Sequence, residues 1–93
     1  MAEEFRRSDA FVYRLTAGEH LLVSLHGRRA ETLFGLTATG AALWKELIDW
    51  RSVDALALRL TTDYDVTPEQ ARVDALEFLE QLTSLGAVER RGE

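Results

Sequence analysis

The sequence predicts an α+β fold in which an N-terminal three-stranded antiparallel β ribbon is followed by three helices. β-branched and aromatic residues gather in short runs before residue 37, a composition typical of strands. After residue 37, apolar residues recur three and four positions apart, which indicates amphipathic helices. Residues that start and stop helices stand at the ends of these periodic segments.

Three strands are expected, at residues 11–15, 20–25 and 30–36, with a turn at residues 17–19. Gly27, followed by Arg28 and Arg29, makes the second turn, because glycine readily takes the positive φ of a tight hairpin. Gly35 interrupts the third strand, and such a glycine often marks a bulge or a close backbone approach. Residues 1–9 are polar and are expected to be frayed.

The first two helices each begin at a residue that can cap a helix. Thr37, with Thr39 as the alternative, offers a side-chain oxygen to the start of a helix that runs to about Trp50. Ser52 caps the second helix in the same way. The apolar stripe of the first helix is Leu43, Trp44, Leu47 and Ile48, and that of the second is Val53, Leu56, Ala57, Leu60 and Tyr64.

The third helix has the clearest start and stop. Thr67 is its cap, Pro68 its first residue, and Gln70 completes a capping box. The helix runs to about Leu85, and Gly86 ends it, before a brief extended segment and a charged tail. Placed at about 100° per residue, its core face is Ala71, Ala75, Phe78, Leu79, Leu82 and Leu85.

Val73 and Leu76 lie outside that face, on the flank that carries Arg72 and Thr83. This apolar shoulder has two interpretations, which the sequence leaves open. In the structural interpretation, the shoulder is a wide core contact or a few isolated surface residues of no consequence. In the functional interpretation, it is the wall of a groove beside the third strand.

The composition predicts one domain spanning residues 1–93, with an ordered core at about 10–89. No apolar run approaches the roughly 18 residues of a membrane span, and the acidic N-terminus lacks the apolar region of a signal peptide. The absence of cysteine fits a cytoplasmic protein. The net charge of −5 argues against nucleic acid as the main partner.

No arrangement of residues typical of an enzyme is present. His20 and His26 have no acidic partner at metal-ligand spacing, so structural roles are expected for both. No serine stands in a glycine-rich elbow, and no phosphate-binding loop occurs. We therefore expect no catalysis, no cofactor and no metal.

Several segments together resemble the PqqD-like family, the recognition elements for ribosomally made, post-translationally modified peptides (RiPPs). They are Leu36–Trp44, Leu47-Ile48, Val53–Leu56, Asp74-Ala75, Phe78-Leu79, Leu82 and Leu85–Val88. The resemblance spans about residues 11–89 and implies a winged helix-turn-helix. It also implies that the protein binds the leader segment of a precursor peptide and presents it to a maturation enzyme.

Two departures from the family pattern refine this expectation. Thr37 stands where the family usually has asparagine, and both side chains can cap a helix. Ile48-Asp49-Trp50 stands where PqqD proper tends to have Cys-Asp-Gly, which argues against pyrroloquinoline quinone synthesis. The pattern is closer to stand-alone leader-binding proteins of lasso-peptide pathways, which work with a leader peptidase, although a radical-SAM maturase is an equal possibility.

In this family the leader adds as a strand beside the third strand and lies against the third helix. The resemblance therefore implies a peptide-binding set of Arg29, Ala30, Glu31, Thr32, Leu33, Phe34, Gly35, Arg72, Val73, Leu76, Leu79 and Thr83. The leader's main chain is expected to pair with Glu31, Leu33 and Gly35, or with the alternate residues. Arg72 and the Arg28–Arg29 turn are expected to meet leader carboxylates.

Two other functions stay open. A winged-helix regulator would bind DNA through its third helix, but residues 68–85 carry one arginine against four acidic residues, a net charge of −3. A recognition helix needs the opposite sign. The second alternative is a subunit that docks on an enzyme and has no affinity for a leader.

Overall fold

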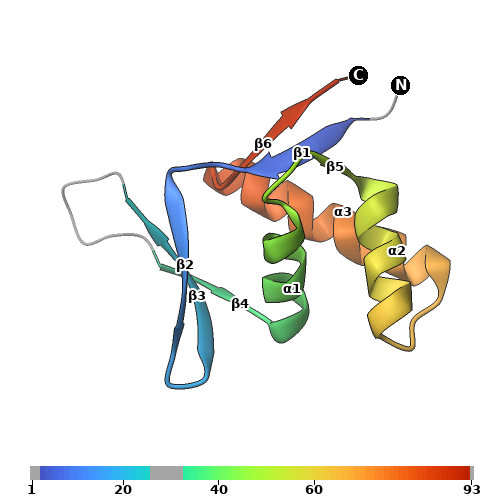
Figure 1. Cartoon of the computed structure of the whole chain (residues 1–93), viewed down its shortest axis with the longest axis horizontal. Helices are drawn as coiled ribbons and strands as arrows, with labels where there is room; N and C mark the ends of the chain where they lie inside the picture. The colour runs from blue at the N-terminus through green and yellow to red at the C-terminus, as the bar shows by residue number, and fades with distance from the viewer. Residues whose placement is uncertain (1–2, 26–32, 93) are drawn as a thin grey trace.

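The computed structural model describes residues 3–25 and 33–92, which form two small sheets and three helices (Figure 1). The strands are β1 (Glu4–Arg7), β2 (Phe11–Thr16), β3 (Glu19–Ser24), β4 (Leu33–Leu36), β5 (Arg51–Ser52) and β6 (Val88–Arg91). The helices are α1 (Ala38–Glu46), α2 (Val53–Asp63) and α3 (Pro68–Leu85). The expected α+β class, with an antiparallel ribbon followed by three helices, is confirmed.

The larger sheet has the strand order β2-β3-β4, and both pairs are antiparallel. Ala17 and Gly18 make the β2–β3 turn with φ of 51° and 82°, which is the two-residue geometry that suits the twist of a hairpin. The β3–β4 register is continuous, from Val23 opposite Leu33 to His20 opposite Leu36. No extra residue is therefore inserted at Gly35, and the bulge considered for that position is absent from β4.

The smaller sheet, with strand order β5-β1-β6, joins the two ends of the chain. Residues 4–7 were expected to be frayed, and this expectation is wrong, because Phe5 is only 4% exposed and packs in the core. Charged side chains stabilise the same strand from outside. The guanidinium groups of Arg6 and Arg91 stack on the Trp50 ring at 4.6 and 4.3 Å from its centroid.

The first helix ends earlier than the expected Trp50. Leu47 is its C-cap and donates its N–H to the carbonyl of Trp44. The chain then turns so that Arg51 and Ser52 can pair with β1, and Arg51 Nε donates to the carbonyl of Glu46 at the helix end. As a result Ile48 leaves the predicted apolar stripe and is 58% exposed.

The other helix ends follow the sequence. Thr37, Ser52 and Thr67 each accept a hydrogen bond from a first-turn backbone N–H, and Gly86 ends α3 with φ 88°. One detail differs. Gln70 does not return the bond to its cap, because its side-chain amide donates to Asp74 one turn later.

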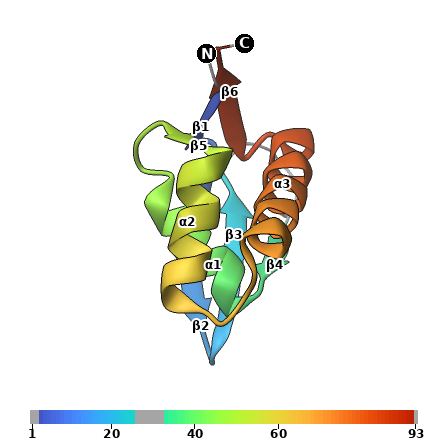
Figure 2. The same cartoon turned by 90° about the vertical axis from the view of Figure 1, so that its right-hand side faces the viewer.

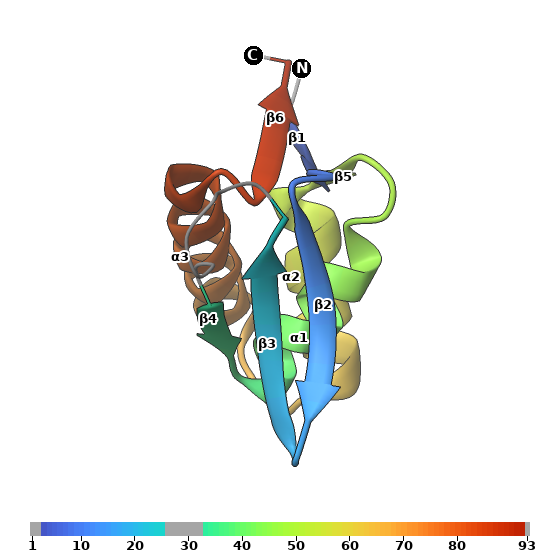
Figure 3. The same ribbon diagram turned by 90° about the vertical axis from the view of Figure 1, so that its left-hand side faces the viewer.

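The hydrophobic core lies between the inner face of the larger sheet and the three helices (Figures 2 and 3). Its largest fully buried side chains are Trp44, Leu22, Leu43, Leu47, Leu56, Leu79 and Leu82. α2 packs along α3, and β4 leads directly into α1. β4 and α3 lie on the same side of the molecule (Figure 3). None of the helices among residues 3–25 and 33–92 is long and apolar enough to cross a membrane.

Candidate functional site

β4 is an edge strand of the larger sheet. It pairs with β3 on one side, and no described strand pairs with its other side. Figure 3 shows β4 as the outermost strand of this sheet, on the same side of the molecule as α3. An open edge presents unpaired backbone groups that a further strand can use.

The register determines which backbone groups face the open side. Leu25 donates its N–H to the carbonyl of Ala10, and hydrogen-bonded and non-bonded pairs alternate along an antiparallel ladder. Counting from that pair, Leu21 and Val23 bond to β2, whereas His20 and Leu22 direct their backbone groups to β4. Their cross-strand partners on β4 are Leu36 and Phe34, respectively.

Leu33 and Gly35 therefore point their N–H and C=O groups away from β3. These are two of the three positions expected from the sequence to pair with a guest strand. A Cβ placed on Gly35 would meet no described residue within 4 Å on the outer face of the sheet. The side chain of Leu33 is 61% exposed on the outer face of the sheet.

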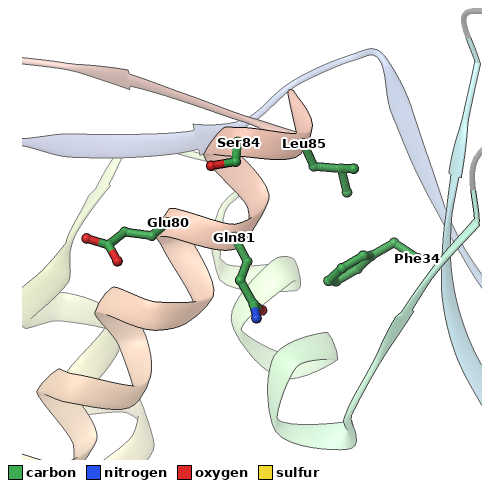
Figure 4. Close-up of a pocket in the computed structure, with 5 residues that line it drawn as sticks. All are labelled: Phe34, Glu80, Gln81, Ser84 and Leu85. Carbon is green, nitrogen blue, oxygen red and sulfur yellow. The ribbon is translucent and has the colours of Figure 1, made fainter.

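A first cavity lies between β4 and the end of α3. Its volume is about 480 Å³, and it is lined by Phe34, Glu80, Gln81, Ser84 and Leu85. Figure 4 shows Gln81 and Leu85 pointing toward the Phe34 ring, whereas Glu80 and Ser84 point away from it. Phe34 and Leu85 are partly buried against the core, so this cavity has an apolar floor.

A second cavity continues the groove toward the start of α1. Its volume is about 360 Å³, and its lining is Thr37, Thr39, Gly40, Leu43, Asp74, Glu77, Phe78 and Gln81. Gln81 lines both cavities. Asp74 is half-buried and Glu77 is exposed, so two carboxylates stand on the α3 side of this second cavity. We call the two cavities together the β4–α3 groove.

The structure distributes the residues expected at the site unevenly. Leu33, Phe34 and Gly35 lie on β4 at the groove. Arg29, Ala30, Glu31 and Thr32 lie outside the described residues, as do His26, Gly27 and Arg28. The third strand is described only from Leu33 onward.

Arg72 lies on the α2 side of α3. It donates to the carboxylate of Asp54 in α2, and both residues line a separate cavity of about 460 Å³ between α2 and α3. Arg72 and Gln81 are nine positions apart, which places them about 180° from each other around the helix. Arg72 therefore faces away from β4.

The other expected residues of α3 occupy different surroundings. Leu79 is 1% exposed and belongs to the core. Thr83 is partly buried, and its hydroxyl has no hydrogen-bond partner among the described residues. Val73 and Leu76 are 47% and 37% exposed, and Leu76 lies about 200° around the helix from Phe78.

Sequence reasoning missed the residues of α3 that line the groove. These are Asp74, Glu77, Phe78, Glu80, Gln81, Ser84 and Leu85. Phe78 and Leu85 had been assigned to the core face, and both do pack against the core while also lining the groove. The signal that could have found the set is a polar row beside that face, in which Asp74, Glu77 and Gln81 recur at three- and four-residue spacing.

Among the described residues, no group of three or more histidine, cysteine, aspartate or glutamate side chains could hold a metal ion. His20 instead forms a structural pair, in which its Nδ1 lies 2.6 Å from the hydroxyl of Tyr13. What the β4–α3 groove offers to a ligand is the free backbone groups of β4, apolar side chains and carboxylates.

The family model for coenzyme PQQ synthesis protein D (PqqD) matches residues 19–88. A lasso peptide synthetase B1 complexed with the leader peptide is 25% identical, with a TM-score of 0.75 over 91% of this chain and 96% of that chain. TbiB1 in complex with the TbiA(beta) leader peptide is 26% identical, with a TM-score of 0.75 over 90% and 94%. Curated protein sequences gave no match.

Proposed function

Because this chain belongs to the PqqD family and is a PqqD-like RiPP recognition element, we propose that it captures the leader segment of a precursor peptide by strand addition to β4. Backbone hydrogen bonds from an added strand give affinity, and side-chain pockets beside it give specificity. The observation that carries the proposal is the outward direction of the Leu33 and Gly35 backbone groups beside the β4–α3 groove. The two similar solved structures each contain a leader peptide.

We propose that the binding set is centred on the groove. Leu33 and Gly35 supply the backbone bonds, Phe34 and Leu85 supply apolar contact, and Gln81 lies between the two cavities. Arg29 to Thr32 stay in the proposed set because they precede β4 in the chain. Arg72, Leu79 and Thr83 act through the fold in this proposal, since they lie away from the groove or in the core. Val73 stays in the proposed set, because it lies about 20° around the helix from Glu80 and Ser84 in the first cavity. Leu76 lies farther toward Arg72 and is left outside the set.

The protein works, in this proposal, as a non-catalytic adaptor in the cytoplasm. It delivers the bound precursor to a maturation enzyme, which is a leader peptidase of a lasso-peptide pathway or a radical-SAM maturase. We propose that this fold acts as a winged helix-turn-helix, in which α2 and α3 are the helix pair and the β2–β3 hairpin is the wing. The acidic balance of α3 disfavours the DNA-binding alternative.

The experiment uses two matched proline variants at the two open edges of one sheet. Gly35→Pro removes an N–H that β3 does not use, so we expect the fold to persist and the affinity for the precursor peptide to fall about tenfold or more. Leu15→Pro is the control, because by the same alternation Leu15 on β2 points its N–H away from β3. Isothermal titration calorimetry measures both dissociation constants, and circular dichroism measures both melting temperatures.

Two results would contradict the proposal. One is a folded Gly35→Pro variant that binds the precursor peptide as tightly as the unmodified protein. The other is equal loss of affinity in the Leu15→Pro variant, since that would place strand addition at β2 or show that binding does not use a sheet edge.

A further inference from the structure

The direction of the β4 side chains determines which residues of an added strand would meet α3. This step rests on the proposed strand addition. Residues directly opposite each other in an antiparallel or parallel pair project to the same face of the sheet. Guest residues opposite Phe34 and Leu36 would therefore point toward α3, and those opposite Leu33 and Gly35 would point away.

The two inward positions of the guest fall at the two cavities of the groove. Inward residues of a strand are spaced about 7 Å apart. The position opposite Phe34 meets the first cavity, where Phe34 and Leu85 form an apolar floor. The position opposite Leu36 lies next to the start of α1 at Thr37, and so meets the second cavity with Asp74 and Glu77.

The second cavity is acidic and has no cation of its own among the described residues. Asp74 receives a hydrogen bond from the neutral amide of Gln70, and neither Asp74 nor Glu77 forms an ion pair with a described residue. The one arginine of α3, Arg72, is held by Asp54 on the opposite flank. Two carboxylates three residues apart on a helix repel each other weakly, and a guest cation would relieve that repulsion.

We propose that the leader recognised by this groove carries an apolar side chain opposite Phe34 and a lysine or arginine two positions away, opposite Leu36. The apolar side chain fills the first cavity beside Leu85. The basic side chain reaches Asp74 and Glu77 in the second cavity. The net charge of the whole chain, −5, favours approach of such a basic segment.

A competing role for the carboxylates is to stabilise the start of α1. That helix has no acidic residue in its first turn, and negative charge near a helix N-terminus is stabilising. The two roles differ in what they change. A role in α1 predicts a lower melting temperature on neutralisation, whereas a role in recognition predicts a change in peptide selection at nearly constant melting temperature.

The experiment is a selection from an mRNA-display library of random 16-residue peptides. The baits are the unmodified protein, the variant Asp74→Asn/Glu77→Gln, and Glu69→Gln as a matched control on the α2 side of the same helix. We expect peptides enriched on the unmodified protein to carry an apolar residue and a lysine or arginine two positions apart. The double variant should lose the basic preference and retain the apolar one, and Glu69→Gln should retain both.

Affinities of one enriched peptide and of its lysine-to-norleucine analogue make the test quantitative. Replacing the lysine should weaken binding to the unmodified protein about threefold to tenfold, because partly exposed ion pairs are worth up to about 1 kcal/mol each. The analogue and the parent should bind the double variant equally. Raising the salt concentration should remove the difference on the unmodified protein.

The outcomes separate this inference from the proposed function. Enriched peptides that need the open edge, and so fail to bind Gly35→Pro, but show no basic preference would overturn the inference and leave strand addition intact. A double variant with a clearly lower melting temperature and unchanged selection would assign the carboxylates to α1 and overturn it as well. Enriched peptides that bind Gly35→Pro normally would contradict strand addition itself.

Discussion

Leu22 of β3 and Phe34 of β4 are direct cross-strand partners on the inner face of the larger sheet. Leu22 is fully buried, and Phe34 is partly buried against the same core. The Phe34 ring thus rests on a fixed neighbour while its free side lines the groove toward α3 (Figure 4). The pair couples the position of the binding surface to the packing of the core.

Phe34→Ala should therefore affect binding and stability together. Truncation of a partly buried phenylalanine removes apolar contact with the core, and we expect the free energy of unfolding to fall by about 1–3 kcal/mol. Loss of the groove's aromatic surface should weaken leader binding about tenfold. Chemical denaturation and calorimetry measure the two effects, and Phe34→Leu should recover most of the stability. Unchanged affinity in a folded Phe34→Ala variant would remove Phe34 from the site.

Gln81→Trp should block the groove without disturbing the fold. Gln81 is exposed and lines both cavities. An indole at this position would therefore fill the part of the β4–α3 groove in which the side chains of the leader are proposed to bind. We expect at least a tenfold loss of affinity for the precursor peptide and a change in the free energy of unfolding within about 0.5 kcal/mol, as is usual for exposed sites.

Leu58→Trp is the matched control for that substitution. Leu58 is a 66% exposed residue of α2 that lines the cavity between α2 and α3. It therefore lies across α3 from the β4–α3 groove. Its replacement should leave the affinity within twofold. If Leu58→Trp weakened binding and Gln81→Trp did not, the leader would lie between α2 and α3 instead of beside β4.

The sequence was sufficient for most of the fold because the relevant signals are local. Thr37, Ser52, Thr67 and Gly86 act within one helical turn of their own position, and all four helix ends follow them. The missed strands depend on distant partners. β1 pairs with residues more than 40 positions away. Phe5 is its one buried residue and is flanked by charged residues, so the segment shows no alternation of apolar and polar residues that would predict a strand.

The site was partly predictable for a related reason. A free edge at β4 follows from counting strands, but the choice between the two flanks of α3 does not. A helical wheel gives the angle between Leu76 and Gln81 and carries no information on which of them faces β4. That choice is made by the packing of α3 on α2, where Arg72 pairs with Asp54.

Trp50→Ala tests the sheet that the sequence did not reveal. The guanidinium groups of Arg6 on β1 and Arg91 on β6 both contact the Trp50 ring, and each cation–π contact at a partly exposed site contributes about 0.5–1 kcal/mol. With the lost apolar contact of the indole, we expect a fall of about 1–3 kcal/mol in the free energy of unfolding, measured by urea denaturation.

Amide hydrogen exchange shows whether Trp50→Ala destabilises only the smaller sheet or the whole fold. Because β1 and β6 join the chain ends far from β4, amide hydrogen exchange in the Trp50→Ala variant should accelerate in residues 4–7 and 88–91 before it does in β3. Leader affinity measured well below the melting temperature should stay within twofold. Trp50→Phe keeps an aromatic face for both arginines and should recover part of the stability. If exchange accelerated uniformly instead, the smaller sheet would be part of the same cooperative unit as the groove, and mutations at the chain ends would weaken leader binding as well.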